Sequence, residues 1–246
     1  MARYDFNAQR LYVEADLAAG TTVACNPDQA NYLRNALRLK AGDPILVFNG
    51  RDGEWRAALA EAGKRGVALR IGDKVREQQG GPDIDYLFAP LKRARLDYMV
   101  QKAVEMGVAR LRPVVTRRTI AERVNMERLA ANAVEAAEQC GILRIPKLHA
   151  PEKLEHAIAG WDANRALIFC DEDSEEACPF TALARVAPGP LAVLIGPEGG
   201  FEAGERELLS SQPFVTRISL GPRILRADTA AVAALALVNA ALGDWR

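Results

Sequence analysis

Two short, uninterrupted apolar runs constrain the fold of this chain more than any other feature. They are Ala166–Cys170 and Leu191–Ile195, and Val215–Leu220 follows as a third strand candidate. Apolar runs of this length are typical of strands buried on both faces of a parallel sheet. Further strands are predicted at Ile84–Leu91 and Leu111–Val115. Apolar residues recur at helical spacing between the strands, and this alternation predicts an α/β domain with a parallel sheet.

The N-terminal third has a different pattern, made of short strands and turn residues. Strands are predicted at Ile45–Phe48, Glu54–Leu59 and Val67–Ile71, and Asn49-Gly50 marks a turn after the first of them. Such a unit is typical of a small β-barrel. Because the run Gln78–Pro82 interrupts every pattern, we predict a barrel domain over residues 1–77, a linker over 78–83 and the α/β domain over 84–246.

Charge is balanced overall but unevenly distributed. The 246 residues carry 32 Lys+Arg and 32 Asp+Glu, so net charge alone does not indicate a nucleic-acid-binding protein. Residues 85–150 nevertheless hold 12 basic against 7 acidic side chains, and residues 151–246 hold 8 against 14. The basic stretch is compatible with an anion-binding face, and ordinary solvated helix surfaces explain it equally well.

Cysteine and histidine content argues against several kinds of site. The four cysteines form no C-x-x-C pair, and the only histidines are His149 and His156. We therefore expect reduced thiols and no metal, and histidine chemistry is disfavoured. No apolar run reaches the roughly 18–20 residues that a membrane span needs. The first residues lack the apolar core of a signal peptide, so we expect a cytoplasmic protein.

Two glycine-bearing loops follow predicted strands and are the main candidates for a binding site. They are Gly196–Phe201 and Gly221–Arg226, and each leads into a predicted helix, the second with Asp228 or Thr229 as its N-cap. Ligands of α/β sheets bind outside the carboxyl ends of the strands, and glycines allow close approach of the backbone. Neither loop has the spacing of a Rossmann or phosphate-binding loop. The loops therefore predict a site for a nucleoside-like ligand, without indicating which reaction takes place there. The alternative is that both loops are tight turns that only end a strand.

The particular residues of these loops resemble a known class of enzymes. Leu194–Phe201, followed by Glu205, is similar to the cofactor loop of the SPOUT class of RNA methyltransferases, and Leu220–Ala230 is similar to their next loop. The pair resembles the 16S rRNA uracil-N3 methyltransferases of the RsmE type. Matching residues upstream extend the resemblance over the whole chain: Lys92, Arg95, Gln101–Val108, Pro113, Arg118, Ala137–Gly141, Arg144 and Pro146, with Arg10, Arg38 and Gly42 in the predicted barrel.

The chain departs from this family's pattern at a few positions. Asp228 stands where the family usually has Glu, which keeps the carboxylate but shortens its reach. Ile142 replaces a common basic residue, and Asn31 replaces a frequent His. These departures affect individual RNA contacts rather than the cofactor site.

The resemblance implies a PUA-like barrel joined to a SPOUT domain with a C-terminal trefoil knot. The knot would bring three strand-end loops around S-adenosylmethionine. Members of the family are homodimers, and the helix Thr229–Leu242 is a candidate interface, although packing within one subunit explains it equally well. The implied cofactor-binding residues are Phe169, Cys170, Ile195, Gly196, Pro197, Glu198, Gly199, Gly200, Leu220, Gly221, Ile224, Leu225, Arg226, Thr229 and Ala230.

The resemblance also implies methylation of uridine N3 in 16S rRNA of the small ribosomal subunit, without a metal. Arg226 is the candidate for stabilising negative charge on the uracil, and an ion pair with Glu198 is its alternative role. Asp228 is a second catalytic candidate, as proton acceptor. The residues expected to contact RNA are Arg10, Arg38, Lys92, Arg95, Arg118 and Arg144. Ribose 2′-O methylation, RNA binding without catalysis and a nucleotide-binding enzyme of another class are the alternatives.

Overall fold

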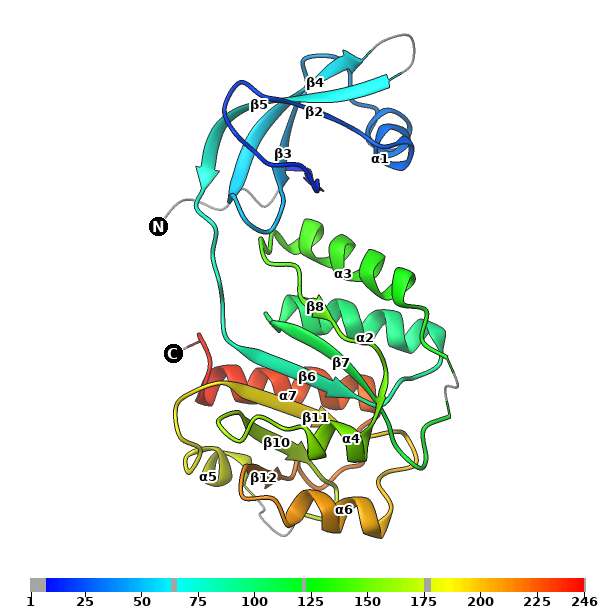
Figure 1. Cartoon of the computed structure of the whole chain (residues 1–246), viewed down its shortest axis with the longest axis vertical. Helices are drawn as coiled ribbons and strands as arrows, with labels where there is room; N and C mark the ends of the chain where they lie inside the picture. Colours follow the sequence, from blue (N-terminus) through cyan, green and yellow to red (C-terminus); the bar gives the residue numbers. More distant parts are fainter. Residues whose placement is uncertain (1–7, 63–65, 121–122, 175–177, 246) are drawn as a thin grey trace. The chain divides into compact units, whose positions relative to one another are not determined.

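A computed structural model describes residues 8–62, 66–120, 123–174 and 178–245 of the chain (Figure 1). The chain divides into two compact units. The first comprises Met1–Gly80 together with Ala137–Ile145, and the second comprises Gly81–Ala136 together with Pro146–Arg246. A short segment far along the sequence therefore belongs to the N-terminal unit, which no feature of the sequence indicates.

The first unit is a curled, five-stranded sheet with the strand order β1-β3-β4-β5-β2 (Figure 1). The three strands predicted from the sequence are confirmed as β3, β4 and β5, which pair antiparallel. A short helix and a π-helical turn, α1 and η1, lie between β2 and β3. The elements are β1 (Arg10–Tyr12), β2 (Thr22–Ala24), α1 (Pro27–Asn31), η1 (Tyr32–Ala36), β3 (Pro44–Phe48), β4 (Glu54–Ala62) and β5 (Gly66–Arg76).

The second unit contains the predicted parallel sheet, with the order β12-β10-β11-β6-β7-β8 and with β9 also paired to β7. All of its strand pairs are parallel. The central strands are buried along their whole length, as their apolar sequences predict. The strands are β6 (Ile84–Phe88), β7 (Arg110–Val115), β8 (Lys147–Leu148), β9 (Glu152–Lys153), β10 (Ala166–Cys170), β11 (Leu191–Ile195) and β12 (Val215–Ile218).

The strand order separates the two glycine loops by one strand, and two strands are shorter than predicted. The two glycine loops follow β11 and β12, which are not neighbours, because β10 pairs with both. β6 ends at Phe88 rather than Leu91, since Pro90 has no N–H for the ladder. β12 ends at Ile218 rather than Leu220. The trefoil knot is not tested by this strand order and stays a prediction.

Helices accompany the parallel strands, and α2 packs against α7. The Asn239 side chain of α7 donates a hydrogen bond to the Met106 carbonyl oxygen at 2.9 Å. None of the described helices combines the length and the apolar character needed to cross a membrane. The helices are α2 (Arg93–Glu105), α3 (Met126–Cys140), α4 (Leu154–Ala159), α5 (Pro179–Leu183), α6 (Ala203–Ser210) and α7 (Ala227–Ala241).

The start of α7 differs from its prediction. The helix begins at Ala227, so its N-cap residue is Arg226, and no side chain caps it. Asp228 and Thr229 lie inside the first turn, and the N-cap role predicted for them is wrong. Asp228 still complements the helix dipole, because a carboxylate in the first turn faces the positive helix end.

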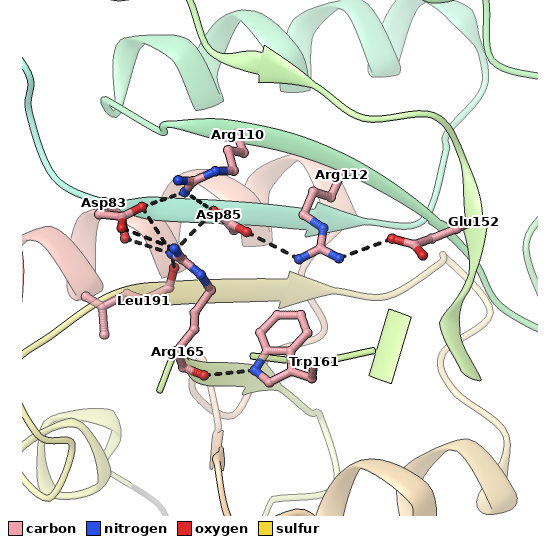
Figure 2. Close-up of polar contacts among 8 residues, drawn as sticks. All are labelled: Asp83, Asp85, Arg110, Arg112, Glu152, Trp161, Arg165 and Leu191. Carbon is pink, nitrogen blue, oxygen red and sulfur yellow. Dashed lines mark hydrogen bonds and ion pairs between the residues drawn. The ribbon is translucent and has the colours of Figure 1, made fainter. Parts of the chain in front are cut away.

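A network of ion pairs around the buried carboxylate of Asp85 lies at the amino ends of the parallel strands (Figure 2). The Asp85 side chain, 3% exposed, accepts a hydrogen bond from Arg110 Nη1 at 2.7 Å and from Arg112 Nη1 at 3.3 Å. Arg165 Nη1 donates to the Leu191 carbonyl oxygen at 2.9 Å, and its guanidinium also pairs with Asp83. These contacts join the beginnings of β6, β7, β10 and β11, so they fix the alignment of the sheet at this edge.

Candidate active site

The carboxyl ends of β10, β11 and β12 surround a pocket of about 280 Å³. Such a volume is close to the lower end of the roughly 300–1,000 Å³ of small-molecule sites. The three strand-end loops expected from the sequence are thus brought together at one edge of the sheet. The pocket is lined by Cys170, Asp171, Glu172, residues 195–201, Ser219, Leu220, Gly221, Arg223, Ile224 and Leu225, and by Ala227 and Ala230 of α7.

Most of the residues expected to bind a cofactor line this pocket, but three do not. Phe169 is fully buried beneath it, and Arg226 and Thr229 lie exposed beyond it. Asp171 and Glu172 line the pocket but were not predicted, although both directly follow a predicted strand, where ligands of parallel sheets bind. Ser219 and Ala227 also line the pocket without having been predicted, and Phe201 and Arg223 belong to the predicted binding loops but not to the predicted cofactor ligands.

The loop after β11 owes its shape to glycines at two different positions. A β-carbon at Gly196 would overlap the ring of Phe201, so this glycine permits close packing of the loop onto an aromatic ring. Phe201 in turn meets the Phe169 ring edge-on, with 4.9 Å between the ring centres. Gly200 has φ of +69°, a left-handed conformation that favours glycine. Part of the glycine pattern therefore serves the protein's own packing rather than access for a ligand.

The loop after β10 is held by a buried carboxylate. Asp171 is 2% exposed, and its two oxygens accept hydrogen bonds from Arg206 Nε at 3.1 Å and from Arg217 Nη2 at 2.7 Å. Burial, followed by the charge of Asp171, raises the pKa of the neighbouring Cys170 thiol. Cys170 is therefore a neutral thiol in the wall of the pocket, and it is not suited to act as a nucleophile.

A second hollow, of about 640 Å³, lies on the other side of Glu198. We call it the basic pocket; its lining consists of Leu91, Lys92, Arg93, Ala94, Arg95, Arg123 and Glu198. Arg95 forms an ion pair with Glu198, and Arg118 Nη1 donates a hydrogen bond to the Gly199 carbonyl oxygen at 2.8 Å. Three of the residues expected to contact RNA, Lys92, Arg95 and Arg118, thus lie beside the loop that lines the first pocket.

The other residues expected to contact RNA belong to the first unit. Arg38 is exposed there, in a left-handed conformation with φ of 56°, and Arg144 is partly buried. Arg10 is 4% exposed, and its Nε donates to Glu54 Oε1 at 2.9 Å. Glu54 also pairs with Arg76. Because a phosphate could reach Arg10 only by breaking this buried pair, the RNA contact expected for Arg10 does not fit the structure.

The two residues expected to act in catalysis lie at the start of α7. Arg226 is exposed, and Glu198, its expected alternative partner, pairs with Arg95 instead. Asp228 Oδ1 accepts a hydrogen bond from the Thr229 amide at 2.9 Å. Tyr86 of β6 is fully buried, and its hydroxyl has no hydrogen-bond partner among the described residues. Burial, with the nearby charge of Asp228 as a smaller cause, raises the pKa of Tyr86.

Comparison with known proteins decides the family. Residues 79–239 match the family model described as "RNA methyltransferase domain", and residues 26–72 match "RNA methyltransferase PUA domain". Ribosomal RNA small subunit methyltransferase E of Rickettsia conorii is 31% identical over 94% of each chain. The protein of the same name from Synechocystis is also 31% identical, over 96% of this chain and 78% of its own. The chain belongs to the RNA methyltransferase family.

Solved structures of methyltransferases share the fold. A methyltransferase of Legionella pneumophila, determined in complex with its cofactor S-adenosylmethionine, has a TM-score of 0.84 and 29% identity, covering 97% of this chain and 99% of its own. Ribosomal RNA small subunit methyltransferase E from Neisseria gonorrhoeae, bound to S-adenosyl methionine, has a TM-score of 0.85 and 25% identity, covering 98% and 100%. The predicted parallel sheet is confirmed, and the predicted PUA-like barrel is present as a curled five-stranded sheet.

Proposed function

We propose that this chain transfers a methyl group from S-adenosylmethionine to N3 of a specific uridine in 16S rRNA. One observation carries the proposal: the glycine-bearing loops form one pocket at the carboxyl ends of β10, β11 and β12. The chain that contains this pocket resembles small subunit rRNA methyltransferases over nearly its full length. Two similar structures hold S-adenosylmethionine.

The residues of the pocket suit S-adenosylmethionine. Apolar side chains such as Leu220 and Leu225 would flank the flat adenine ring, and glycine backbone would lie within hydrogen-bonding reach of polar edges. The carboxylates of Glu172 and Glu198 line the pocket and would favour a cofactor with a positively charged sulfur. Of the residues expected from the sequence, we therefore propose the twelve that line the pocket as cofactor ligands: Cys170, Ile195, Gly196, Pro197, Glu198, Gly199, Gly200, Leu220, Gly221, Ile224, Leu225 and Ala230.

The protein's contribution to the reaction is alignment and charge stabilisation. S-adenosylmethionine, when bound, supplies a methyl group already activated by the adjacent positive sulfur. The uracil must lose its N3 proton and hold negative charge on its oxygens while the protein aligns it. Arg226 is exposed at the rim of the loop after β12, where its guanidinium can donate hydrogen bonds to those oxygens. Asp228, in the first turn of α7, is the candidate proton acceptor.

The RNA partner is proposed to bind at the basic pocket. Lys92, Arg93, Arg95 and Arg123 line it, and such a cluster neutralises phosphate charge. The pocket shares Glu198 with the cofactor pocket, so a nucleotide bound there lies next to the methyl donor. In the PUA-like unit, Arg38 and Arg144 remain proposed RNA contacts.

We also propose a homodimer and the C-terminal trefoil knot, which the family resemblance implies. One side of α7 leaves apolar residues partly exposed, at the spacing of a helix face: Val232, Ala233, Ala236 and Leu237. Covering this face by a second copy would remove apolar surface from water.

Calorimetric titration with S-adenosylmethionine and nucleoside mass spectrometry test the proposal in turn. We expect micromolar binding of the cofactor, and we expect 16S rRNA from cells lacking the protein to lose one N3-methyluridine. A methyl group found on a ribose 2′-oxygen would support the alternative reaction. The absence of cofactor binding would overturn the proposed function and leave two alternatives, RNA binding without catalysis and a nucleotide-binding enzyme of another class.

A further inference from the structure

Glu198 is the residue that joins the two pockets. It lies in the loop after β11, and it lines both the cofactor pocket and the basic pocket. Its carboxylate pairs with Arg95 of α2, and both side chains are 40% exposed. The next residue of the loop, Gly199, is bound from the same side by Arg118. The cofactor loop is therefore held by two arginines, of which Arg95 lines the proposed RNA site.

The ion pair between Arg95 and Glu198 is open to exchange. An ion pair this exposed to solvent contributes little to stability, so replacing one partner costs little. A phosphate is a strong competitor for a guanidinium, because it accepts two parallel hydrogen bonds from it. A phosphate that enters the basic pocket would meet Arg95 and would release the Glu198 carboxylate.

We propose that RNA and S-adenosylmethionine bind this protein cooperatively, with Glu198 passing from Arg95 to the cationic cofactor when an RNA phosphate takes its place. This inference rests on the proposed function, since it assigns the two pockets to these two ligands. In the free protein, Arg95 neutralises Glu198. Once Arg95 is bound to phosphate, the carboxylate faces the cofactor pocket unpaired and favours a positively charged ligand there. Glu198 is thus a positioning residue that makes each ligand strengthen the binding of the other.

Calorimetric titration of the full chain with S-adenosylmethionine, with and without a short uridine-containing single-stranded RNA, measures this coupling. We expect the saturating RNA to tighten cofactor binding about 5-fold, the lower end of typical coupling between sites. S-adenosylhomocysteine, which lacks the charge on sulfur, should show a smaller factor. In Glu198→Gln and in Arg95→Gln the factor should fall to about 1, because no carboxylate is exchanged.

Two further variants separate this exchange from general charge effects. Glu172→Gln also removes a carboxylate from the cofactor pocket, but Glu172 pairs with Arg206 rather than with a residue of the basic pocket, so its coupling should persist. Lys92→Gln removes a cation from the basic pocket without touching Glu198, so RNA should bind more weakly with the coupling intact. Thermal unfolding of each variant establishes that it is folded.

The outcomes distinguish this inference from the proposed function. If both ligands bind but neither alters the affinity of the other, the inference is wrong and the proposed function stands. The inference is equally wrong, with the proposed function intact, if Glu198→Gln keeps the full coupling or if the RNA fails to bind. If S-adenosylmethionine does not bind at all, the proposed function fails together with the inference.

Discussion

The two edges of the parallel sheet use charged residues in opposite ways. At the amino edge, Asp83 and Asp85 are bonded to Arg110, Arg112 and Arg165, and the formal charges nearly cancel within the network (Figure 2). At the carboxyl edge, four cations line the basic pocket beside one carboxylate, Glu198, among the described residues. The parallel sheet therefore has mutually paired charges at its amino edge and ligand-accessible loops at its carboxyl edge.

Charged residues at the amino edge hold the structure, whereas those at the carboxyl edge are available to ligands. Burial raises the pKa of Asp83, but hydrogen bonds from Arg165 and Arg110 outweigh it and lower the pKa overall. This carboxylate is therefore ionised and hydrogen-bonded to its arginine partners, and it is not available to a ligand. Arg226 at the opposite edge has no ion-pair partner among the described residues, and its side chain is exposed. Replacing residues of the two edges should therefore affect stability at one edge and chemistry at the other.

The largest effect is expected at the amino edge, from Asp85→Ala. This change removes the buried acceptor shared by Arg110 and Arg112, which keep only the more exposed carboxylates of Asp83 and Glu152 as partners. Breaking a buried ion pair typically costs about 3–5 kcal/mol. We expect a loss of that size in the free energy of unfolding, measured by urea denaturation. Glu155→Ala, which breaks the exposed pair with Arg117, is the control and should cost less than about 1 kcal/mol. Similar losses of unfolding free energy in both variants would show that the amino-edge network does not stabilise the fold more than an exposed ion pair does.

The sequence predicts the sheet well because its strands are buried on both faces. The apolar runs of β10 and β11 have no other stable environment, and their bounds match the structure. The positions of the glycine-bearing loops can also be predicted from the sequence, since they directly follow strands of this sheet. By contrast, β8 and β9 have two residues each and carry no periodic pattern. Their pairing depends on β7, a contact between residues distant in the sequence.

The roles of charged side chains could not be predicted from the sequence, because they depend on partners far along the chain. Arg10 pairs with Glu54, which is 44 residues away in the sequence. Glu198, which lines both pockets, pairs with Arg95 of α2. Nothing local to these residues distinguishes a buried ion pair from a free cation. The missed pocket residue Asp171 follows the same rule, since Arg206 and Arg217 approach it from α6 and β12.

At the carboxyl edge, Arg226→Ala should reduce catalysis without unfolding the protein. If Arg226 stabilises charge on the uracil, its loss should lower kcat about 100-fold, as for other groups that donate to a developing negative charge. Cofactor affinity should change little, because Arg226 does not line the cofactor pocket. Single-turnover methylation assays and calorimetry measure the two quantities. Arg226→Lys should recover part of the rate, since it keeps the charge but loses the planar donor geometry. A normal kcat in Arg226→Ala would remove the proposed catalytic role.

The smallest effect concerns His149, which is the exception at the amino edge. Its Nε2 atom is buried and has no hydrogen-bond partner among the described residues. Burial, followed by the charges of Arg112 and Lys147, lowers its pKa. As the pH falls below the ordinary histidine value of about 6.5, the unfolded chain takes up this proton before the folded chain does. The free energy of unfolding should therefore decrease with acidification through this range, and His149→Gln should flatten the decrease in urea denaturation series.

His156→Gln, which replaces the exposed histidine of α4 and retains His149, is the matched control. If His149→Gln left the pH dependence of the unfolding free energy unchanged, His149 would not be the source of the decrease and the prediction would be wrong.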